Sequence, residues 1–395
     1  MYESDPGQRL RVLYSFPHPF GTAGTGSTAR NQVAGLEALG HDVTLACTSV
    51  APGVPRPNDT VETMVVGGRR IPNRLVGAER AWGWHDRSVA RMLRQRAREF
   101  DVVHAWPLAS ARTLAEARSQ GVVGAREAPN THTAHAYEVV RRECENLGFE
   151  PPRGHSHQPN ERRLRKELRE YGLANRILVP SVYAAQTFLE QGVPSDRLRV
   201  HQYGSDPSRF FPVEARGDRP FTVIFVGRCE PRKGLHHALR AWRASEVGLD
   251  GGRFIVCGTF MRGYRELLQR LLDSPGVACA GFTDDVPHLM RSADALVLSS
   301  VEEGSALVSY EAMASGCAPL VSQAVGARCE HHVSGLIHEP GDWQTLATHI
   351  RLLADDERTR TDLQVGAAKR GAELTWIRAA EVTADCYTND ATDVG

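Results

Sequence analysis

Two glutamates flank a turn at the start of a helix in the C-terminal half of the chain. The apolar run 295–298 predicts a buried strand, and Gly316 is a typical helix C-cap, so we expect a helix between them that begins near Ser305. Glu303 then lies in the loop before the helix, and Glu311 lies about two turns inside it. The free N–H groups of the first turn and the helix dipole favour a phosphate. The segment therefore predicts an anion site between two carboxylates.

Two cations follow an earlier strand of the same half. The apolar run 221–226 predicts a strand, and it leads into Gly227, Arg228 and, five residues later, Lys233. Because ligands bind at the carboxyl ends of strands in parallel sheets, we expect both cations at the ligand-binding edge. A guanidinium and an ammonium there suit a diphosphate with about two negative charges. We expect the start of the helix and the two cations to bind the same anion.

A glycine-rich segment, 21–29, follows the first predicted strand, 9–16. It contains Gly24 and Gly26 in a Gly-x-Gly-x-x-Ala pattern, which is also the fingerprint of dinucleotide-binding folds. The second strand, 43–47, is not followed by the acid that would bind a ribose 2′-hydroxyl, which weakens the dehydrogenase interpretation. Because glycine has no side chain, the backbone of this segment can still approach an anion such as a phosphate closely.

Strands and helix-compatible segments alternate along the whole chain. This pattern predicts mostly parallel sheets covered on both faces. It breaks in the turn-rich stretch 203–212 and then restarts, so we expect an α/β protein with two Rossmann-like, doubly wound domains facing a central cleft. The expected divisions are an N-terminal domain over 1–205, a C-terminal domain over 206–375, and a helix or tail over 376–395 that returns to the first domain. The expected strands are 9–16, 43–47, 102–104, 177–179, 198–200, 221–226, 254–256, 295–298 and 319–321.

Composition narrows the classes of function. The 395 residues are 41% hydrophobic and 24% charged, as in ordinary globular proteins of two to three domains. The 47 basic and 47 acidic residues leave no net charge, which argues against a nucleic-acid partner. No run approaches a membrane span and the N-terminus lacks a signal-peptide pattern, so we expect a cytoplasmic protein. The eight cysteines are too widely spaced for a zinc motif.

The charged motifs together resemble a known enzyme family. Gly-Arg-(four residues)-Lys-Gly at 227–234, Glu-(seven residues)-Glu at 303–311, and Glu-Ala-Met-Ala-Ser-Gly at 311–316 are similar to motifs of the retaining GT-B glycosyltransferases of the group 1 type, which include glycogen and sucrose-phosphate synthases. Further similar segments occur at 38–45, 101–105, 204–212 and 335–342. The resemblance implies transfer of a hexosyl group from a nucleoside diphosphate sugar, expected to be a UDP-sugar, to a hydroxyl of an acceptor, with retention at the anomeric carbon.

The resemblance also implies a role for each site residue. Arg228 and Lys233 would bind the donor diphosphate. Glu311 would bind the ribose hydroxyls, and Glu303 the hydroxyls of the transferred sugar. Where the family often has Glu-Gly-Phe-Gly, this chain has Glu-Gly-Ser-Ala, so the pocket for the sugar is expected to differ in shape. The other expected donor-binding residues are Gly304, Ser305, Ala306, Leu307, Val308, Gly24 and Gly26.

A histidine of the N-terminal half would complete the catalytic set with Glu303. His132 best matches the family's His-Thr position, and His135 remains the alternative. No Asp-x-Asp metal clamp occurs, so we expect no metal and no cofactor besides the sugar nucleotide itself, with cations and a helix dipole neutralising the leaving group.

The expected partners are a nucleotide sugar and a hydroxyl acceptor, which is either a small molecule or a lipid-linked glycan. The arginine stripe over 87–98 is more typical of a solvated helix face than of contact with anionic lipid. The oligomeric state is not predicted. Two other functions stay open at this point, namely a sugar-nucleotide epimerase of the same fold and a non-catalytic sugar-nucleotide-binding protein.

Overall fold

The chain forms two compact units. The computed structural model describes residues 9–71, 76–152, 154–155, 157–213 and 219–388. Unit 1 comprises Met1–Pro129, Asn160–Gln202 and Trp376–Gly395, and unit 2 comprises Asn130–Pro159 and Tyr203–Thr375.

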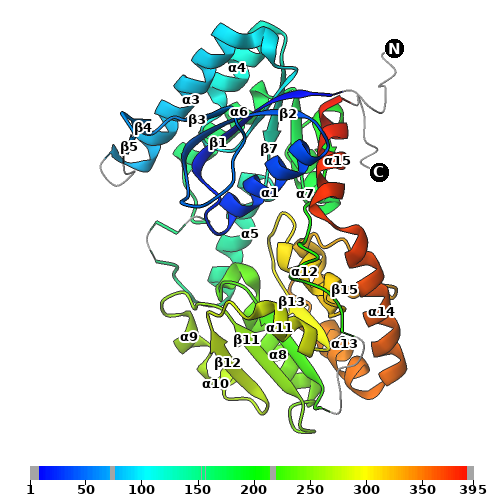
Figure 1. Ribbon diagram of the computed structural model, residues 1–395. Helices are drawn as coiled ribbons and strands as arrows, with labels where there is room; N and C mark the ends of the chain where they lie inside the picture. Colours follow the sequence, from blue (N-terminus) through cyan, green and yellow to red (C-terminus); the bar gives the residue numbers. More distant parts are fainter. Residues whose placement is uncertain (1–8, 72–75, 153, 156, 214–218, 389–395) are drawn as a thin grey trace. The chain divides into compact units, whose positions relative to one another are not determined.

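Unit 1 is built around a seven-stranded sheet in which every pairing is parallel (Figure 1). The strand order is β3-β2-β1-β6-β7-β8-β9, so the order reverses between β1 and β6. The strands are β1 (Arg11–Phe20), β2 (Asp42–Val50), β3 (Thr60–Glu62), β6 (Val102–Ala105), β7 (Val123–Glu127), β8 (Arg176–Val179) and β9 (Leu198–Val200). A short antiparallel pair, β4 (Val65–Val66) and β5 (Arg69–Arg70), lies outside this sheet.

The central strand β1 is buried on both faces because helices cover the sheet from both sides. Successive side chains of a strand point to opposite faces. Tyr14 of β1 belongs to an apolar cluster with Leu36 of α1, whereas Leu13 belongs to a separate cluster with Leu93 of α3. The helices of this unit are α1 (Thr25–Ala38), α3 (Ala78–Arg96), α4 (Ala111–Gln120), α6 (Glu161–Leu173), α7 (Val182–Glu190) and α15 (Trp376–Thr388). The doubly wound arrangement expected from the sequence is confirmed in this unit.

The last helix, α15, packs on the first, α1 (Figure 1). The two helices approach closely at Gly35, where an added Cβ would lie 2.7 Å from the Cβ of Ala380 and 2.9 Å from the carbonyl oxygen of Trp376. Only glycine allows this approach without a shift of one helix. The C-terminal helix thus contributes to the core of unit 1.

Unit 2 contains a six-stranded parallel sheet of the same design. Its order is β12-β11-β10-β13-β14-β15, which reverses between β10 and β13. The strands are β10 (Thr222–Val226), β11 (Arg253–Cys257), β12 (Val277–Gly281), β13 (Ala295–Leu298), β14 (Ala318–Ser322) and β15 (Leu336–His338). The helices are α5 (Thr133–Asn146), α8 (Leu235–Ser245), α9 (Tyr264–Leu267), α10 (Gln269–Leu272), α11 (Val286–Ser292), α12 (Leu307–Ala314), α13 (Trp343–Asp355) and α14 (Glu357–Glu373). In such sheets ligands bind at the reversal point, so the loops after β10 and β13 are the natural binding loops.

The division differs from the expected one in residues 130–159 and, by three residues, at the boundary 203–205. Residues 130–159, which the sequence assigned to the N-terminal domain over 1–205, group with unit 2. The reason is that both ends of α5 bond to unit 2, through Thr131 to Glu302 and through Glu143 to the histidines of α8. Periodicity in the sequence reveals a helix, but it does not reveal which sheet that helix packs against.

Among the described residues, no helix combines the length and the apolar character needed to cross a membrane.

Candidate active site

The loop after β10 is held against the loop after β13. It contains a short 3-10 turn, η3 (Pro231–Lys233), that ends at Gly234 with φ +68°. An added Cβ at Gly234 would lie 1.8 Å from the carbonyl oxygen of Ser299. The Ser299 hydroxyl donates to the Gly234 carbonyl at 2.7 Å, and the Val301 N–H donates to the Arg232 carbonyl at 2.9 Å. These contacts fix the two charged loops relative to each other at the reversal point of the sheet.

Four charged side chains from these loops form one buried ion cluster. Arg232 contacts Glu302 at 3.3 Å and Glu303 at 3.2 Å. Lys233 pairs with the other oxygen of Glu303. Two of the predicted site residues, Lys233 and Glu303, are therefore brought together, while Arg232 and Glu302 are members that the sequence analysis missed.

Burial and charge shift the proton equilibria of this cluster. Burial raises the pKa of Glu302, but Arg232 and a hydrogen bond from Thr131 outweigh it, so this pKa lies below its usual value. Burial and the adjacent Arg232 lower the pKa of Lys233 to about 7, although the charges of Glu230 and Glu302 oppose this shift. Glu230 also pairs with Arg232 at 3.0 Å, so three carboxylates surround Arg232 and Lys233 in this part of the structure.

Arg228 is the exposed cation beside this cluster. Its side chain is 59% exposed, and its Nε lies 3.3 Å from Glu230. It also lines a pocket of about 500 Å³ at the carboxyl ends of β10 and β11, with Phe260 and Phe282 among the other lining residues. A guanidinium at the rim of a largely apolar pocket suits a ligand that is charged at one end and flat and apolar at the other.

The helix start lies two residues later than predicted. Helix α12 begins at Leu307 with Ala306 as its N-cap, because the Ser305 hydroxyl donates to the Gly326 carbonyl at 2.8 Å instead of capping the helix. Within the residues that the structure describes, the backbone N–H groups of Leu307 and Val308 have no hydrogen-bond acceptor. This leaves two donors at the positive end of the helix dipole, as the predicted phosphate cradle requires.

Glu311 lies on the second turn of α12, eight residues after Glu303 of the ion cluster. Burial raises its pKa to about 7, and the only opposing contribution comes from Arg209. The carboxyl group is therefore balanced between its neutral and charged forms near neutral pH. A ligand that donates hydrogen bonds to it would favour the carboxylate.

His132 is the N-cap of α5, and its Nδ1 accepts from the Ala134 N–H at 3.3 Å. The preceding residue, Thr131, donates to Glu302 through its hydroxyl at 2.6 Å. His132 is buried next to this bond, and His135 is half-buried on the first turn of the same helix. The structure therefore ties the His132 segment to the ion cluster and leaves His135 as the alternative.

Two further histidines border the ion cluster. The Nε2 atom of His155 lies 3.1 Å from Glu230, and that of His157 lies 3.7 Å from Glu302. Burial, followed by the charge of Arg232, lowers the pKa of His157 to about 4. The sequence analysis did not select them, because the surrounding stretch is rich in proline and glycine and carries no motif.

Gly24 and Gly26 lie in unit 1, at the start of α1. Gly24 has φ +78° and open space around the position of a Cβ. An added Cβ at Gly26 would lie 2.5 Å from the Thr22 hydroxyl and 2.9 Å from the Pro19 carbonyl oxygen. Both glycines thus have a local structural role, and their predicted contact with the donor stays a prediction.

Comparison with known proteins places the chain in a family. A family model described as Glycosyl transferases group 1 matches residues 208–370, and one described as Glycosyltransferase Family 4 matches residues 22–209. A protein of Pseudarthrobacter chlorophenolicus named D-inositol 3-phosphate glycosyltransferase is 29% identical over 289 residues, which cover 66% of this chain and 64% of that protein. The protein of the same name from Arthrobacter sp. (strain FB24) is 26% identical over 426 residues, which cover 96% of this chain and 94% of that one. For the first relatives, the match spans only 58 to 66% of their length.

Solved structures show the same fold. Sucrose-phosphate synthase from Thermosynechococcus elongatus has a TM-score of 0.69 at 19% identity, with 96% of this chain and 98% of that chain covered. The Anabaena protein HepE in complex with UDP-glucose has a TM-score of 0.65 at 15% identity, with 95% and 99% covered. WaaG, a glycosyltransferase involved in lipopolysaccharide biosynthesis, has a TM-score of 0.66 at 17% identity, with 96% and 100% covered. The chain has the GT-B fold, and the two family models, which together match residues 22–370, place it among the glycosyltransferases of the group 1 type.

Proposed function

We propose that this glycosyltransferase transfers a hexosyl group from a UDP-sugar to a hydroxyl group, with retention at the anomeric carbon and without a metal ion at the leaving group. One observation carries the proposal: Arg232 and Lys233 of the loop after β10 pair with Glu303, which lies shortly before α12, and the first two N–H groups of this helix have no hydrogen-bond acceptor among the described residues. This arrangement supplies positive charge and hydrogen-bond donors where an anionic leaving group needs them.

The ion pair of Lys233 with Glu303 indicates how the donor would enter. In the structure the Glu303 carboxylate pairs with Lys233, the residue that we propose binds a phosphate oxygen of the donor. When the diphosphate binds, Lys233 would exchange Glu303 for a phosphate oxygen, and Glu303 would then be free to accept hydrogen bonds from the sugar hydroxyls. Arg228 and the N–H groups of Leu307 and Val308 would bind the remaining phosphate oxygens, and Glu311 the ribose hydroxyls.

The transfer needs mainly positioning and charge stabilisation from the protein. The bond between the anomeric carbon and the diphosphate oxygen breaks, and the acceptor oxygen bonds to the same carbon on the same face. The acceptor proton passes to the departing phosphate oxygen, so the balance requires no other reactant. His132, next to the Thr131–Glu302 bond, would help to position the sugar, and His135 is the alternative for this role.

The acceptor is either a small molecule or a lipid-linked glycan. The curated relatives are named for D-inositol 3-phosphate, so a phosphorylated polyol is the first acceptor to test. The cytoplasmic location likewise remains a prediction.

The function can be tested before the acceptor is known. Each of a set of UDP- and GDP-sugars is incubated with the protein, and slow release of free sugar is followed by mass spectrometry. We expect hydrolysis of a UDP-sugar by the wild-type protein and its loss in Lys233→Ala. Lys369→Ala, which removes an exposed lysine of α14, serves as the matched control. Conversion of the donor into another UDP-sugar would indicate the epimerase, and tight binding of a donor with no turnover on any acceptor would indicate a binding protein.

Metal independence has a separate test. Protein freed of metal by a chelator should turn over the donor at an unchanged rate when Mg²⁺ or Mn²⁺ is added. A strict requirement for either ion would contradict the proposed role of the cations and the helix start.

A further inference from the structure

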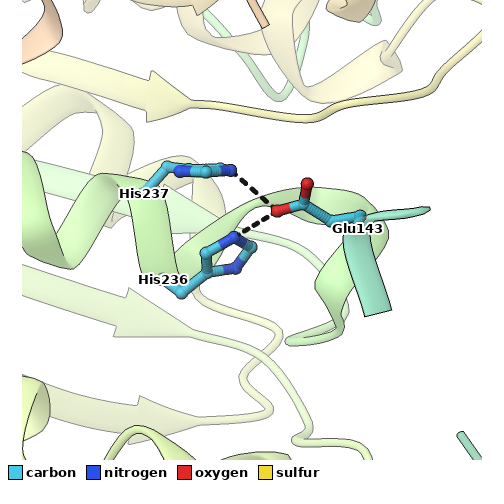
Figure 2. A group of neighbouring side chains, drawn as sticks. All are labelled: Glu143, His236 and His237. Carbon is cyan, nitrogen blue, oxygen red and sulfur yellow. Dashed lines mark hydrogen bonds and ion pairs between the residues drawn. The ribbon is translucent and has the colours of Figure 1, made fainter. Parts of the chain in front are cut away.

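Three potential metal ligands converge outside the residues proposed to bind the donor. Glu143 lies near the end of α5, and His236 and His237 lie on the first turn of α8. The Oε1 atom of Glu143 is 2.5 Å from Nε2 of His236 and 2.8 Å from Nε2 of His237. The carboxylate and both rings point toward one another (Figure 2), and the three ligand atoms lie within 4.8 Å of each other. Adjacent residues of a helix rarely aim at one atom, so the convergence needs an explanation.

The surroundings of the cluster hold these side chains in place. The side chain of His236 is 1% exposed, that of His237 is 9% exposed and that of Glu143 is 12% exposed. The Nδ1 atom of His236 lies 2.7 Å from the hydroxyl of Tyr264, which fixes the orientation of the ring. The Nδ1 atom of His237 is buried and has no hydrogen-bond partner among the described residues.

We propose that Glu143, His236 and His237 form a binding site for a first-row transition-metal ion of the zinc type. One carboxylate oxygen and two imidazole nitrogens are a common set of protein ligands for Zn²⁺, whereas Mg²⁺ and Ca²⁺ prefer oxygen ligands alone. Tetrahedral ligands at about 2.1 Å from zinc lie roughly 3.4 Å apart, so the two contacts with Glu143 have to lengthen by less than about 1 Å. His237 and Glu143 are slightly exposed, which gives the ion access from solvent.

The hydrogen-bonding partners fit a bound ion. A histidine that binds metal through Nε2 carries its proton on Nδ1 and usually donates it to an oxygen. The Tyr264 hydroxyl stands in the right place to accept this hydrogen bond from His236. At His236, binding would therefore move the ring proton from Nε2 to Nδ1, where the Tyr264 hydroxyl can accept it.

The other candidate group, His155, His157 and Glu230, is less suited to a metal ion. Glu230 already pairs with Arg228 at 3.3 Å and with Arg232 at 3.0 Å. Two guanidinium groups on the same carboxylate repel a divalent cation and use the oxygens that would bind it. Burial opposes ionisation of Glu230, but His155 and Arg232 outweigh it and lower its pKa to about 2, as expected for a carboxylate that is satisfied without metal.

A bound ion would clip α5 to α8. The opposite end of α5 is held by the bond between Thr131 and Glu302, so the helix would be fixed at both ends. His236 is three residues beyond Lys233, with the constrained Gly234 between them. The ion would therefore stabilise the segment that carries His132 and the loop that carries Lys233, without touching the donor.

The test measures zinc affinity on the full chain without an affinity tag. Protein stripped by a chelator is titrated with Zn²⁺ in competition with a chromophoric chelator. We expect one tightly bound ion per chain and at least a tenfold loss of affinity in Glu143→Gln and in His237→Gln. His288→Gln, which changes an exposed histidine of α11, and His155→Gln, which changes the competing group, should bind as the wild-type protein does.

Two further measurements keep the proposal testable if a ligand variant folds poorly. Tyr264→Phe leaves all three ligand atoms in place and should weaken zinc binding 10- to 100-fold through loss of the hydrogen bond to His236. Co²⁺ in place of Zn²⁺ should give the visible absorption of a tetrahedral nitrogen and oxygen site in the wild-type protein. Failure of the wild-type chain to bind Zn²⁺, equal affinity in the Glu143→Gln and His237→Gln proteins, or loss of the ion in His155→Gln would each overturn the proposal. None of these outcomes depends on the donor.

Discussion

The two sheets share a strand order but differ in what they place at the reversal point. In unit 2, the loops 227–234 and 299–306 carry three cations and three glutamates. In unit 1, the corresponding loops, 21–24 after β1 and 106–110 after β6, contain no lysine, arginine, aspartate or glutamate. The same topology thus offers a charged site in one unit and a neutral, glycine-rich loop in the other. An anionic donor is expected to depend on unit 2.

Buried carboxylates show a second difference between the units. In unit 1, Glu127 of β7 lies 3.2 Å from His104 and 3.2 Å from His201, and all three side chains are fully buried. Burial opposes ionisation of Glu127, but both histidines outweigh it, so its pKa is far below the usual value. In unit 2, Glu303 faces Lys233, whose side chain is 16% exposed and can exchange partners. A closed network of this kind stabilises a fold, whereas an exchangeable ion pair can serve a ligand.

The largest expected effect is on turnover in unit 2. Lys233→Ala removes a cation from the diphosphate site, and loss of one such group typically lowers turnover by about 100- to 1000-fold. The rate of UDP-sugar hydrolysis measures the effect, and Lys369→Ala is the control for loss of a lysine. A Lys233→Ala protein with a rate within threefold of wild type would show that the donor diphosphate does not bind at this loop.

The paired variants Glu127→Gln and Glu303→Gln separate stability from function. Glu127→Gln breaks a buried network and should lower the free energy of unfolding by about 3 kcal/mol. Glu303→Gln also breaks a buried ion pair, but Lys233 is 16% exposed and can be hydrated, so we expect a smaller loss of stability together with a fall in turnover. Urea denaturation and donor hydrolysis are measured on both proteins. The comparison fails if Glu127→Gln unfolds like the wild type, or if Glu303→Gln is the less stable of the two.

The next effect concerns the pH dependence of donor binding. Because burial raises the pKa of Glu311 to about 7, this carboxyl becomes neutral as the pH falls below 7 and loses acceptor capacity for ribose hydroxyls. Donor affinity should therefore fall from pH 7.5 to pH 5.5, by at most about tenfold per pH unit. Calorimetric titration with UDP at several pH values measures this change. Glu311→Gln should bind weakly with a flat profile, and an equally steep profile in this variant would assign the titration to another group.

The sequence revealed nine of the strands, all rich in apolar residues, but it missed others such as β12 and β15. It also missed β7 (Val123–Glu127), because this strand contains the charged residues Arg126 and Glu127. Charged residues are expected at the surface, but these two are buried. Arg126 is compensated by Glu167 at 2.9 Å, a residue 41 positions away. A pairing between distant residues leaves no periodic signal in the chain.

The sequence predicted those site residues that belong to recognisable motifs. Lys233 and Glu303 were found because they belong to a recognisable pattern, and the structure brings them together. Arg232 and Glu302 are their immediate neighbours in sequence, and nothing in the chain says which of two adjacent charged residues points inward. The assignment of α5 to unit 2 was missed for a related reason, because it depends on side-chain bonds at the two ends of the helix.

The smallest expected effect concerns the glycine loop of unit 1. Gly24→Ala places a Cβ in open space but forces alanine to adopt φ +78°, which costs about 1 kcal/mol. Gly26→Ala also meets the Thr22 hydroxyl and the Pro19 carbonyl, so it should destabilise unit 1 more than Gly24→Ala does. Urea denaturation ranks the two variants, and donor hydrolysis is measured on the same samples. If this neutral loop only completes the fold, hydrolysis will follow stability in both proteins. A loss of turnover in Gly24→Ala well beyond its small loss of stability would mean that the backbone of unit 1 also touches the donor. The loops at the two reversal points would then both bind the donor and would differ only in their charge.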